Sequence, residues 1–437
     1  MIWDITTAAR SFITIISILI KMNLLPILES ARAASRKLLE VPAETIDSLI
    51  VAIADEAEAR SAEIIEANKR DLERFDSSNP LYDRLKLTPE RIAAIAADLR
   101  HVASLPSPVN EVIESRTLPN GLELIKVSVP FGVIGVIYEA RPNVSFDVAS
   151  LCLKSGNACV LKGGSDAIES NKAIVGLIHD VMARFGIDTA AVTLLEGGHD
   201  VTAELLKARG YVDLVIPRGG RRLIDAVRDT ARVPVIETGA GVCHIYVDND
   251  ASIDIAAPVV HNAKTRRVSV CNALDCLIVH DSRLSDLPVI CAALAADGVL
   301  IYADSKAFDA LRDSYPANLL RVADESSFGT EFLSLAMAVK TVESFDEAIE
   351  HINRYGSGHS EAIITEDEEA SRRFSTLVDA ACVYTNAPTS WTDGAQFGLG
   401  AEIGISTQKL HARGPMALRE INTYKWIIRG NGQLRPR

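Results

Sequence analysis

Cys271 is the residue in this sequence whose surroundings best suit covalent chemistry. It follows a basic stretch that contains Lys264, Arg266 and Arg267, and it precedes an apolar run over residues 274–279 that predicts a buried strand. Positive charge nearby lowers the pKa of a thiol, and the thiolate is the form that attacks a carbonyl carbon. The alternative is a small buried hydrophobic residue with no chemical role. A position just before a strand and beside cations favours a nucleophile.

Two glycine turns could hold an anion. Lys162-Gly163-Gly164-Ser165 follows the predicted strand 158–162, and Arg218-Gly219-Gly220 follows the predicted strand 212–217. Glycine lets backbone N–H groups approach a ligand closely, and the N-terminus of the helix that follows favours negative charge. Each turn alone could be a simple strand-to-helix connection, since neither is a Walker loop or a G-x-G-x-x-G motif. Together they favour a dinucleotide with several phosphates, which could include the extra phosphate of NADP.

Two further polar side chains lie at the ends of predicted strands. Asn143 follows the strand 133–138, and its amide could stabilise an oxyanion or cap the next helix. Glu237 ends the predicted strand 233–237, where it could act as a general base or satisfy backbone donors. The residues themselves leave both choices open.

Composition limits the classes of function. The chain has 437 residues, enough for two or three domains, and its net charge of −13 argues against general nucleic-acid binding. Its seven cysteines include no pair with the spacing of metal ligands, so we expect free thiols, a reducing compartment and no bound metal. An apolar run at 12–20 is too short to span a membrane as a helix, and we expect no membrane attachment. We interpret residues 1–21 as an extension, non-native or disordered, upstream of a start at Met22.

Apolar strands alternate with single helices through most of the chain. One series runs over 131–237 and a second begins after residue 250. This alternation predicts two parallel sheets, each covered by helices. The pair Asn120-Gly121 predicts a hairpin turn, and the apolar stretch 421–428 predicts a final strand that could pair with the hairpin, in this chain or in a neighbouring one.

Six motifs occur together in a fixed order. They cover residues 129–143, 161–165, 216–220, 235–239, 270–274 and 400–415. With them the chain, over about residues 24–430, closely resembles the gamma-glutamyl phosphate reductases, also called glutamate-5-semialdehyde dehydrogenases. These enzymes form a proline-biosynthesis branch of the aldehyde dehydrogenase superfamily. Motifs of this length and specificity do not coincide by chance.

The resemblance implies an α/β fold like that of the aldehyde dehydrogenases, with two parallel-sheet α/β domains plus a small β oligomerisation arm. On this pattern residues 22–116 and 129–248 form the NADP-binding domain, 249–390 the catalytic domain with the nucleophilic cysteine, and 117–128 with 391–437 the oligomerisation arm and tail. It also implies a homo-oligomer (a dimer or tetramer), a cytoplasmic location, and a glutamate kinase as a partner that supplies the substrate.

The resemblance further implies the second step of proline biosynthesis from glutamate. Cys271 would attack L-glutamyl 5-phosphate, and the thioester would be reduced with NADPH to L-glutamate 5-semialdehyde. Asn143 and the backbone N–H of Cys271 would hold the oxyanion, and Glu237 has no role because no water must be activated. The expected cofactor contacts are Lys162, Gly163, Gly164, Ser165, Arg218, Gly219 and Gly220. The expected substrate contacts are Arg141, Lys264, Arg266, His411 and Arg413.

Several positions depart from the family pattern. Ser390 stands where the family usually has arginine, Val242 where it has asparagine, and Val268 where it has proline. Pro388 and Trp391 stand where it usually has serine and phenylalanine. If that arginine binds an anionic part of the substrate, two alternatives arise. One is the same chemistry on a different acyl phosphate, and the other is a catalytically silent relative that binds nucleotide or serves as an assembly partner. The intact Cys271 argues against silence, so we expect an active reductase.

Overall fold

The computed structural model describes residues 23–77, 79 and 82–435, so the apolar run at 12–20 and the rest of the proposed extension lie outside the described residues. The chain forms two compact units. The first runs to Glu237 and adds Leu399–Gly404 and the residues from Met416 onward; the second comprises Thr238–Gly398 and Ile405–Pro415.

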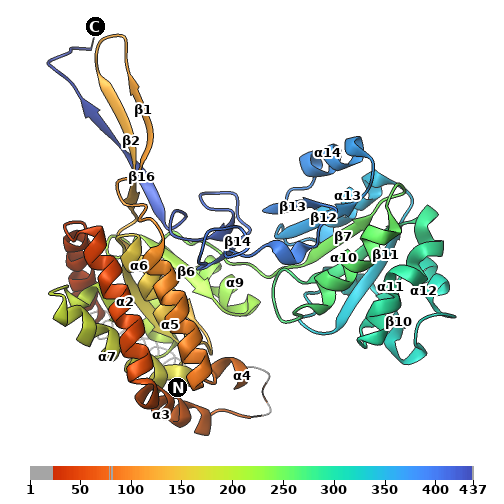
Figure 1. The fold of residues 1–437 in the computed structure, drawn as a ribbon, viewed down its shortest axis with the longest axis horizontal. Helices are drawn as coiled ribbons and strands as arrows, with labels where there is room; N and C mark the ends of the chain where they lie inside the picture. Colours follow the sequence, from red (N-terminus) through yellow and green to blue (C-terminus); the bar gives the residue numbers. More distant parts are fainter. Residues whose placement is uncertain (1–22, 78, 80–81, 436–437) are drawn as a thin grey trace, which may run out of the picture. The chain divides into compact units, whose positions relative to one another are not determined.

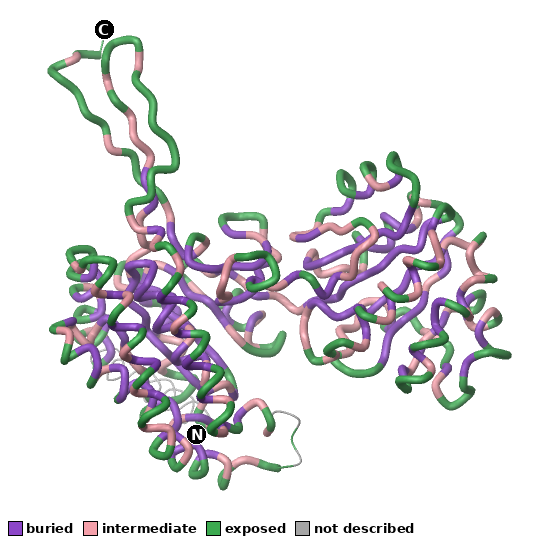
Figure 2. Tube along the Cα trace, in the orientation of Figure 1, coloured by how far each residue is buried: buried purple, intermediate pink, exposed green. Residues whose placement is uncertain are grey.

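A four-stranded parallel sheet forms the centre of the first unit, with the strand order β5-β4-β3-β6. Its strands are β3 (Val133–Tyr138), β4 (Ala158–Gly163), β5 (Val192–Leu194) and β6 (Leu214–Arg218). Every residue of β3 and β4 is buried, as expected for apolar runs covered on both faces (Figure 2). The predicted strand 233–237 is wrong: only an isolated bridge joins Val235 to Val215.

Helices cover this sheet, and most come from the N-terminal region (Figure 1). They are a helix over residues 23–38, α2 (Ala43–Ala59), α3 (Ser61–Glu73), α4 (Tyr82–Leu85), α5 (Pro89–Ser104), α6 (Val144–Lys154), α7 (Ile168–Arg184), α8 (His199–Leu205) and α9 (Arg221–Thr230). Helix α5 shows how local sequence starts a helix. Thr88 accepts a hydrogen bond from the backbone N–H of Arg91 at 3.3 Å, and Pro89 occupies the first turn, where its missing N–H costs nothing.

An arm of three antiparallel strands extends from the first unit (Figure 1). It consists of β1 (Val112–Thr117), β2 (Glu123–Pro130) and β16 (Asn422–Arg429), in the order β1-β2-β16. Gly121 has φ +86°, as the hairpin turn requires. The prediction that the last strand pairs with the hairpin is confirmed within one chain. The hairpin begins at residue 112, earlier than the arm boundary predicted at 117, because every residue of β1 is exposed and the strand lacks the alternating pattern of a half-buried strand.

A seven-stranded parallel sheet forms the second unit, in the order β10-β9-β11-β8-β7-β12-β13. Its strands are β7 (Cys243–Val247), β8 (Leu274–His280), β9 (Leu300–Ala303), β10 (Leu320–Val322), β11 (Ala336–Val342), β12 (Ser360–Ile364) and β13 (Cys382–Thr385). Because β7 lies inside this sheet, between β8 and β12, the boundary between the units falls after Glu237 and not at the expected 248/249.

Two hydrophobic cores hold this second sheet between helices. One core includes side chains of α10 (Ile253–Thr265), α11 (Leu287–Ala296) and α12 (Ser305–Leu311), and the other includes side chains of α13 (Phe345–Tyr355) and α14 (Glu368–Leu377). In the tail, β14 (Gly404–Ser406) and β15 (Gly414–Met416) form a two-stranded ribbon.

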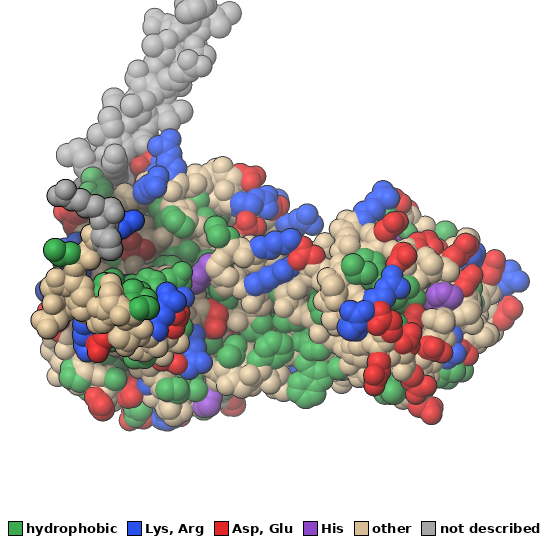
Figure 3. Space-filling view, turned by 90° about the horizontal axis from the view of Figure 1, so that it is seen from above, with side chains coloured by type: hydrophobic (Ala, Val, Ile, Leu, Met, Phe, Trp, Pro, Cys, Tyr) green, Lys and Arg blue, Asp and Glu red, His purple; other side chains and the backbone are tan. Residues whose placement is uncertain are grey.

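On the face shown in Figure 3, both acidic and basic side chains are present at the surface. In the described part of the chain, no helix has both the length and the apolar content that crossing a bilayer requires.

Asn157 joins the tail to the first sheet. Its Oδ1 accepts the backbone N–H of Gly132 at 2.9 Å, and its Nδ2 donates to the carbonyl of Ile421 at 3.0 Å and to Ser155 Oγ at 2.9 Å. The side chain is fully buried. A buried polar group that loses its partner costs about 1–3 kcal/mol.

Replacing Asn157 with Ala should therefore lower the free energy of unfolding by about 2–4 kcal/mol, because Gly132 and Ile421 both lose a partner. Urea unfolding followed by far-ultraviolet circular dichroism measures the effect. The control is Asn353→Ala, at an exposed helical amide, which should change stability little. Equal effects of the two substitutions would show that Asn157 does not hold the tail.

Candidate active site

Cys271 lies in a turn directly before β8, and its side chain is partly exposed. Its Sγ is hydrogen-bonded to His359 Nε2 at 3.2 Å, and His359 lies directly before β12. Strand β7 lies between β8 and β12, so both residues are at the amino-terminal edge of the second sheet. Ligand sites in open α/β sheets usually lie at the carboxyl edge, so this position was not the one expected from the topology.

His359 is fully buried and belongs to a chain of hydroxyl groups. Its Nδ1 is hydrogen-bonded to Ser360 Oγ at 2.8 Å, which is hydrogen-bonded to Thr392 Oγ1 at 2.6 Å, and this hydroxyl meets Tyr384 OH at 2.7 Å. Burial lowers the pKa of His359 from its usual 6.5 to about 4, so the ring is neutral at neutral pH. Depending on its tautomer, neutral His359 either accepts the thiol proton of Cys271 or donates a hydrogen bond to the thiolate.

The backbone around the nucleophile is held from several sides. Cys243 Sγ donates to the carbonyl of Cys271 at 3.2 Å, and a Cβ atom at Gly241 would lie 1.6 Å from that same oxygen. The amide of Asn272 donates to the carbonyl of Thr392 at 2.9 Å, and Thr389 Oγ1 donates to the carbonyl of Asn272 at 2.8 Å. These contacts fix the direction in which the thiol points, as a nucleophile requires.

The cations predicted around Cys271 separate into two groups. Arg266 and Arg267 are exposed, whereas Lys264 is fully buried, donates to the carbonyl of Leu274 at 2.8 Å and lies 3.7 Å from the carboxylate of Asp275. Burial lowers the pKa of Lys264. The expected substrate contact of Lys264 is therefore wrong in this structure, because its ammonium is used inside the unit.

The other expected substrate contacts have mixed surroundings. The guanidinium of Arg413 pairs with Asp379 at 2.9 Å and donates to the carbonyl of Asp379 at 3.0 Å. His411 is exposed and has φ +66°, a conformation unusual for a residue with a side chain. Arg141 is half-buried in the first unit.

Asn143 lies at the N-terminus of α6 in the first unit, and Cys271 lies in the second. The side chain of Asn143 does not cap α6; its Nδ2 donates instead to Asp147 Oδ2 at 3.0 Å. Burial raises the pKa of Asp147 to about 6. The structure thus answers the capping alternative, while the oxyanion role of Asn143 stays a prediction.

The two glycine turns lie at the same sheet edge. Tyr138, at the end of β3, is paired with Gly163 on one side and with Arg218 on the other. The ammonium of buried Lys162 donates to the carbonyl of Gly163 at 2.9 Å, and burial lowers its pKa. Parallel strands bring their carboxyl ends to one edge, as the sequence suggested.

Side chains already occupy part of this edge. A Cβ at Gly164 would lie 2.1 Å from Asp166 Oδ1, and a Cβ at Gly219 would lie 2.4 Å from Glu139 Oε2. Glu139 also accepts the N–H of Gly220 at 3.1 Å, so this expected anion donor has a carboxylate partner. Ser165 is exposed.

Two of the departures from the family pattern, Ser390 and Val242, are buried. Ser390 Oγ donates to Asn262 Oδ1 at 3.0 Å, and the backbone N–H of Val242 donates to Ser357 Oγ at 2.9 Å.

His359 is a candidate functional residue that sequence reasoning missed. It follows Gly356-Ser357-Gly358 and precedes the apolar strand 360–364, which is the same loop-before-strand position as that of Cys271. That similarity was a usable signal, but only the order of strands in the sheet brings the two loops together.

Comparisons with known proteins agree over most of the chain. The model of the aldehyde dehydrogenase family matches residues 18–296 and 321–426. A gamma-glutamyl phosphate reductase of Bacteroides fragilis is 59% identical over 414 residues, which are 95% of this chain and 100% of the relative. The crystal structure of the gamma-glutamyl phosphate reductase of Thermotoga maritima is 43% identical, covers 94% of this chain and 100% of its own, and superposes with a TM-score of 0.91. An acetylating aldehyde dehydrogenase of Geobacillus thermoglucosidasius, 17% identical, shares the fold with a TM-score of 0.67 over 97% of this chain and 99% of its own.

Gly241→Ala should displace the Cys271 turn, because the new Cβ would meet backbone and cannot be relieved by a side-chain rotation. A nucleophile misplaced by about 1 Å loses about 100-fold in turnover. The control is Gly176→Ala, at a helical glycine with open space around it, which should keep full activity. Steady-state kinetics of the folded variants measures this, and a fully active Gly241→Ala enzyme would contradict it.

His359→Ala should lower kcat/KM by about 100-fold or more, the usual contribution of a general base. Because the pKa of His359 is about 4, the acid limb of the wild-type profile should fall near that pH and not near 6.5. The pH dependence of kcat/KM tests this. His261→Ala, at a half-buried histidine bonded to Asp297, should leave the profile unchanged.

Proposed function

The chain belongs to the aldehyde dehydrogenase family and, within it, to the gamma-glutamyl phosphate reductases, and on this basis we propose that it reduces L-glutamyl 5-phosphate to L-glutamate 5-semialdehyde with NADPH. This is the second step of proline biosynthesis from glutamate. The observation that carries the proposal is the hydrogen bond between Cys271 Sγ and His359 Nε2, at 3.2 Å, in a chain 59% identical to a reductase over that enzyme's whole length.

The first chemical step is acylation of Cys271. His359 takes the thiol proton, the thiolate forms a C–S bond to the γ-carbonyl carbon, and the C–O bond to phosphate breaks, so that phosphate leaves with the electron pair. Phosphate is a good leaving group, so a thiolate and an oxyanion site suffice. No water must be activated, which agrees with the position of Glu237, 3.6 Å from Arg228.

Two donors would stabilise the oxyanion that forms on the carbonyl. They are the backbone N–H of Cys271 and the amide of Asn143. To act in this way, the amide of Asn143 would exchange its hydrogen bond to Asp147 Oδ2 for one to the substrate oxygen.

The strand ends of the first unit fit a dinucleotide. At Gly164 and Gly219 a Cβ atom would collide with a neighbouring carboxylate, so the backbone is accessible there only because both residues are glycine. Lys162 and Arg218 supply two cations, and Ser165 supplies a hydroxyl. The carboxylate of Glu139 suits a ribose hydroxyl better than a phosphate. We infer that these residues hold NADPH. When bound, NADPH supplies the hydride that reduces the Cys271 thioester; Cys271 then leaves as the thiolate when the aldehyde is released.

Exposed cations would bind the anionic parts of the substrate. Arg266 and His411 are exposed, and Arg141 is half-buried, so these three remain our candidates. Arg413 would act by fixing Asp379 and the loop that carries His411.

The assembly and the setting follow from the same family. We infer a dimer or tetramer built through the arm, where Val112, Ile113 and Ile428 are more than half exposed. The substrate is a labile acyl phosphate, which favours delivery by a glutamate kinase. Seven free cysteines fit a reducing cytoplasm.

A different acyl phosphate is the second candidate function. The observation behind it is Ser390, whose hydroxyl bonds Asn262 at a position where the family usually carries arginine. A panel of acyl phosphates separates the two: a preference for any other substrate over L-glutamyl 5-phosphate would favour this alternative.

The direct test is the reverse reaction. Wild-type protein given L-glutamate 5-semialdehyde, phosphate and NADP should produce NADPH, followed by absorbance, and omission of phosphate should stop turnover. Cys271→Ala should lose activity by about 10⁴-fold or more, because the covalent route is gone, while it still binds NADP. Cys291→Ala, at a buried cysteine of α11, is the matched control and should stay active. No turnover by folded, NADP-binding wild type would overturn the proposal.

A further inference from the structure

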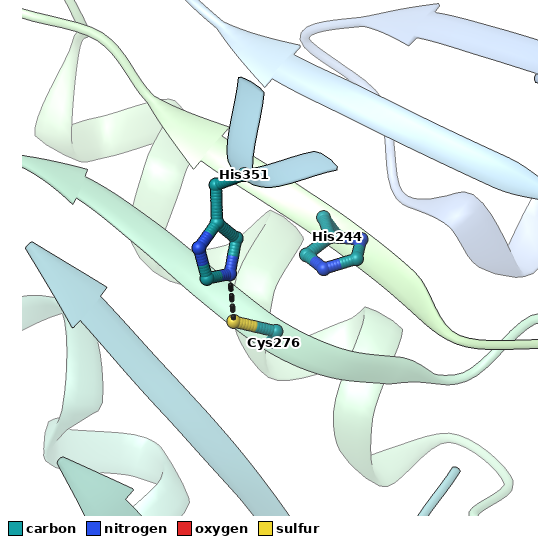
Figure 4. Close-up of side chains that lie close together, drawn as sticks. All are labelled: His244, Cys276 and His351. Carbon is teal, nitrogen blue, oxygen red and sulfur yellow. Dashed lines mark hydrogen bonds between the residues drawn. The ribbon is translucent and has the colours of Figure 1, made fainter. Parts of the chain in front are cut away.

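Two histidines and a cysteine converge inside the second unit (Figure 4). His244 comes from β7, Cys276 from β8 and His351 from α13, and all three are buried. One ligand atom of each lies within 4.8 Å of those of the other two. None of these residues takes part in the proposed reaction.

His244 presents a nitrogen that has no partner among the described residues. Its Nδ1 is hydrogen-bonded to Glu361 Oε2 at 3.0 Å, and the same oxygen accepts the backbone N–H of His244 at 2.8 Å. This leaves Nε2 fully buried and unpaired. A buried polar atom without a partner is costly, so such an atom calls for an explanation. A carboxylate bonded to the far nitrogen is the usual support of a histidine that binds metal.

The distance between the other two ligand atoms suits a tetrahedral metal. Cys276 Sγ and His351 Nε2 are 3.7 Å apart. Bonds of about 2.3 Å to sulfur and about 2.0–2.1 Å to nitrogen, at a tetrahedral angle, place those atoms about 3.6 Å apart. An ion fits between these two atoms with little movement of either side chain, and His244 Nε2, which lies within 4.8 Å of both, would move toward it to complete the site.

We propose that His244 Nε2, Cys276 Sγ and His351 Nε2 bind one zinc ion. On binding, the thiol proton of Cys276 leaves to solvent and a Zn–S bond forms, while each imidazole contributes a nitrogen lone pair. The charges balance: the thiolate and the carboxylate of Glu361 together neutralise a divalent ion, whereas a monovalent ion would leave one negative charge buried. The fourth position would hold a water molecule or another small ligand.

Access to this site has a candidate route. Glu361 and Gly356 line a cavity of about 300 Å³. Glu361 Oε1 is itself buried without a partner, so the polar group behind His244 adjoins that cavity.

Packing alone accounts for only part of the cluster. The ring of His351 stacks edge-on against Phe328, with centroids 5.3 Å apart, and lies 4.7 Å from the ring of Tyr355. These contacts explain why His351 is buried, but they leave His244 Nε2 unpaired. A zinc ion accounts both for the burial of His351 and for the unpaired His244 Nε2. It would also link β7, β8 and α13.

Zinc content tests the proposal directly and does not depend on the proposed reaction. Full-length wild type is incubated with zinc chloride, dialysed against metal-free buffer and measured by inductively coupled plasma mass spectrometry. We expect about one zinc per chain in wild type and loss of most of it in Cys276→Ser. Cys291→Ser, at a buried cysteine in the core on the other face of the sheet, is the matched control and should keep its zinc.

A second variant tests whether zinc is bound by the catalytic thiol and not by the proposed site. Cys271 lies near His359 and could bind zinc adventitiously, so Cys271→Ala should still hold one ion per chain if our assignment is correct. Zinc-free wild type overturns the proposal, and so does zinc retained by Cys276→Ser or lost from Cys271→Ala.

Cobalt(II) substitution reports metal binding in the wild-type protein, so it does not depend on whether a variant folds. Cobalt(II) added to chelator-treated wild type with Cys271 blocked by iodoacetamide should give the thiolate-to-cobalt charge-transfer band and the visible bands of a tetrahedral ion. Absence of these bands would also overturn the proposal.

Discussion

The hydrogen bond between Cys271 and His359 depends on the order of three strands. Because β7 separates β8 from β12, the loops that precede these two strands end on the same edge of the sheet, and the thiol reaches the ring at 3.2 Å. Burial keeps that ring neutral, and its hydroxyl neighbours fix its orientation. The contacts of Gly241 and Asn272 then serve one purpose, which is to keep the thiol at this distance. A sheet with another strand order would carry the same residues without a site.

The first unit is also a parallel α/β sheet, but its candidate site lies at the opposite, carboxyl edge of the strands. Its glycine turns lie at the carboxyl edge of the sheet, where helix N-termini favour a phosphate, and its carboxylates modify that preference. Glu139 holds the N–H of Gly220, so the edge combines positive and negative groups. Such a mixture suits a nucleotide, which presents sugar hydroxyls beside its phosphates, better than it suits a simple anion.

Burial decides what each polar residue of the second unit can do. Lys264 and Glu361 are both enclosed, and each is used to satisfy neighbouring groups: Lys264 bonds the carbonyl of Leu274, and Glu361 orients His244. The proposed zinc would extend this principle, since it would satisfy His244 Nε2, a buried imidazole nitrogen without a partner among the described residues. Strand β8 would then carry a zinc ligand at Cys276, five residues after the nucleophile. The turn that carries Cys271 and the proposed metal would then both be anchored to β8.

The sequence by itself determined the fold class, the hairpin and the family, because apolar periodicity, the Asn120-Gly121 turn and long motifs are local properties. It also singled out Cys271, whose neighbours along the chain carry the signal. It did not identify His359 as that cysteine's partner or His244, Cys276 and His351 as one cluster, and it placed Lys264, which is buried, among the substrate contacts. Only the tertiary structure decided these points. Contacts between residues distant in the chain follow from strand order and burial, and neither is written in the spacing of neighbouring residues.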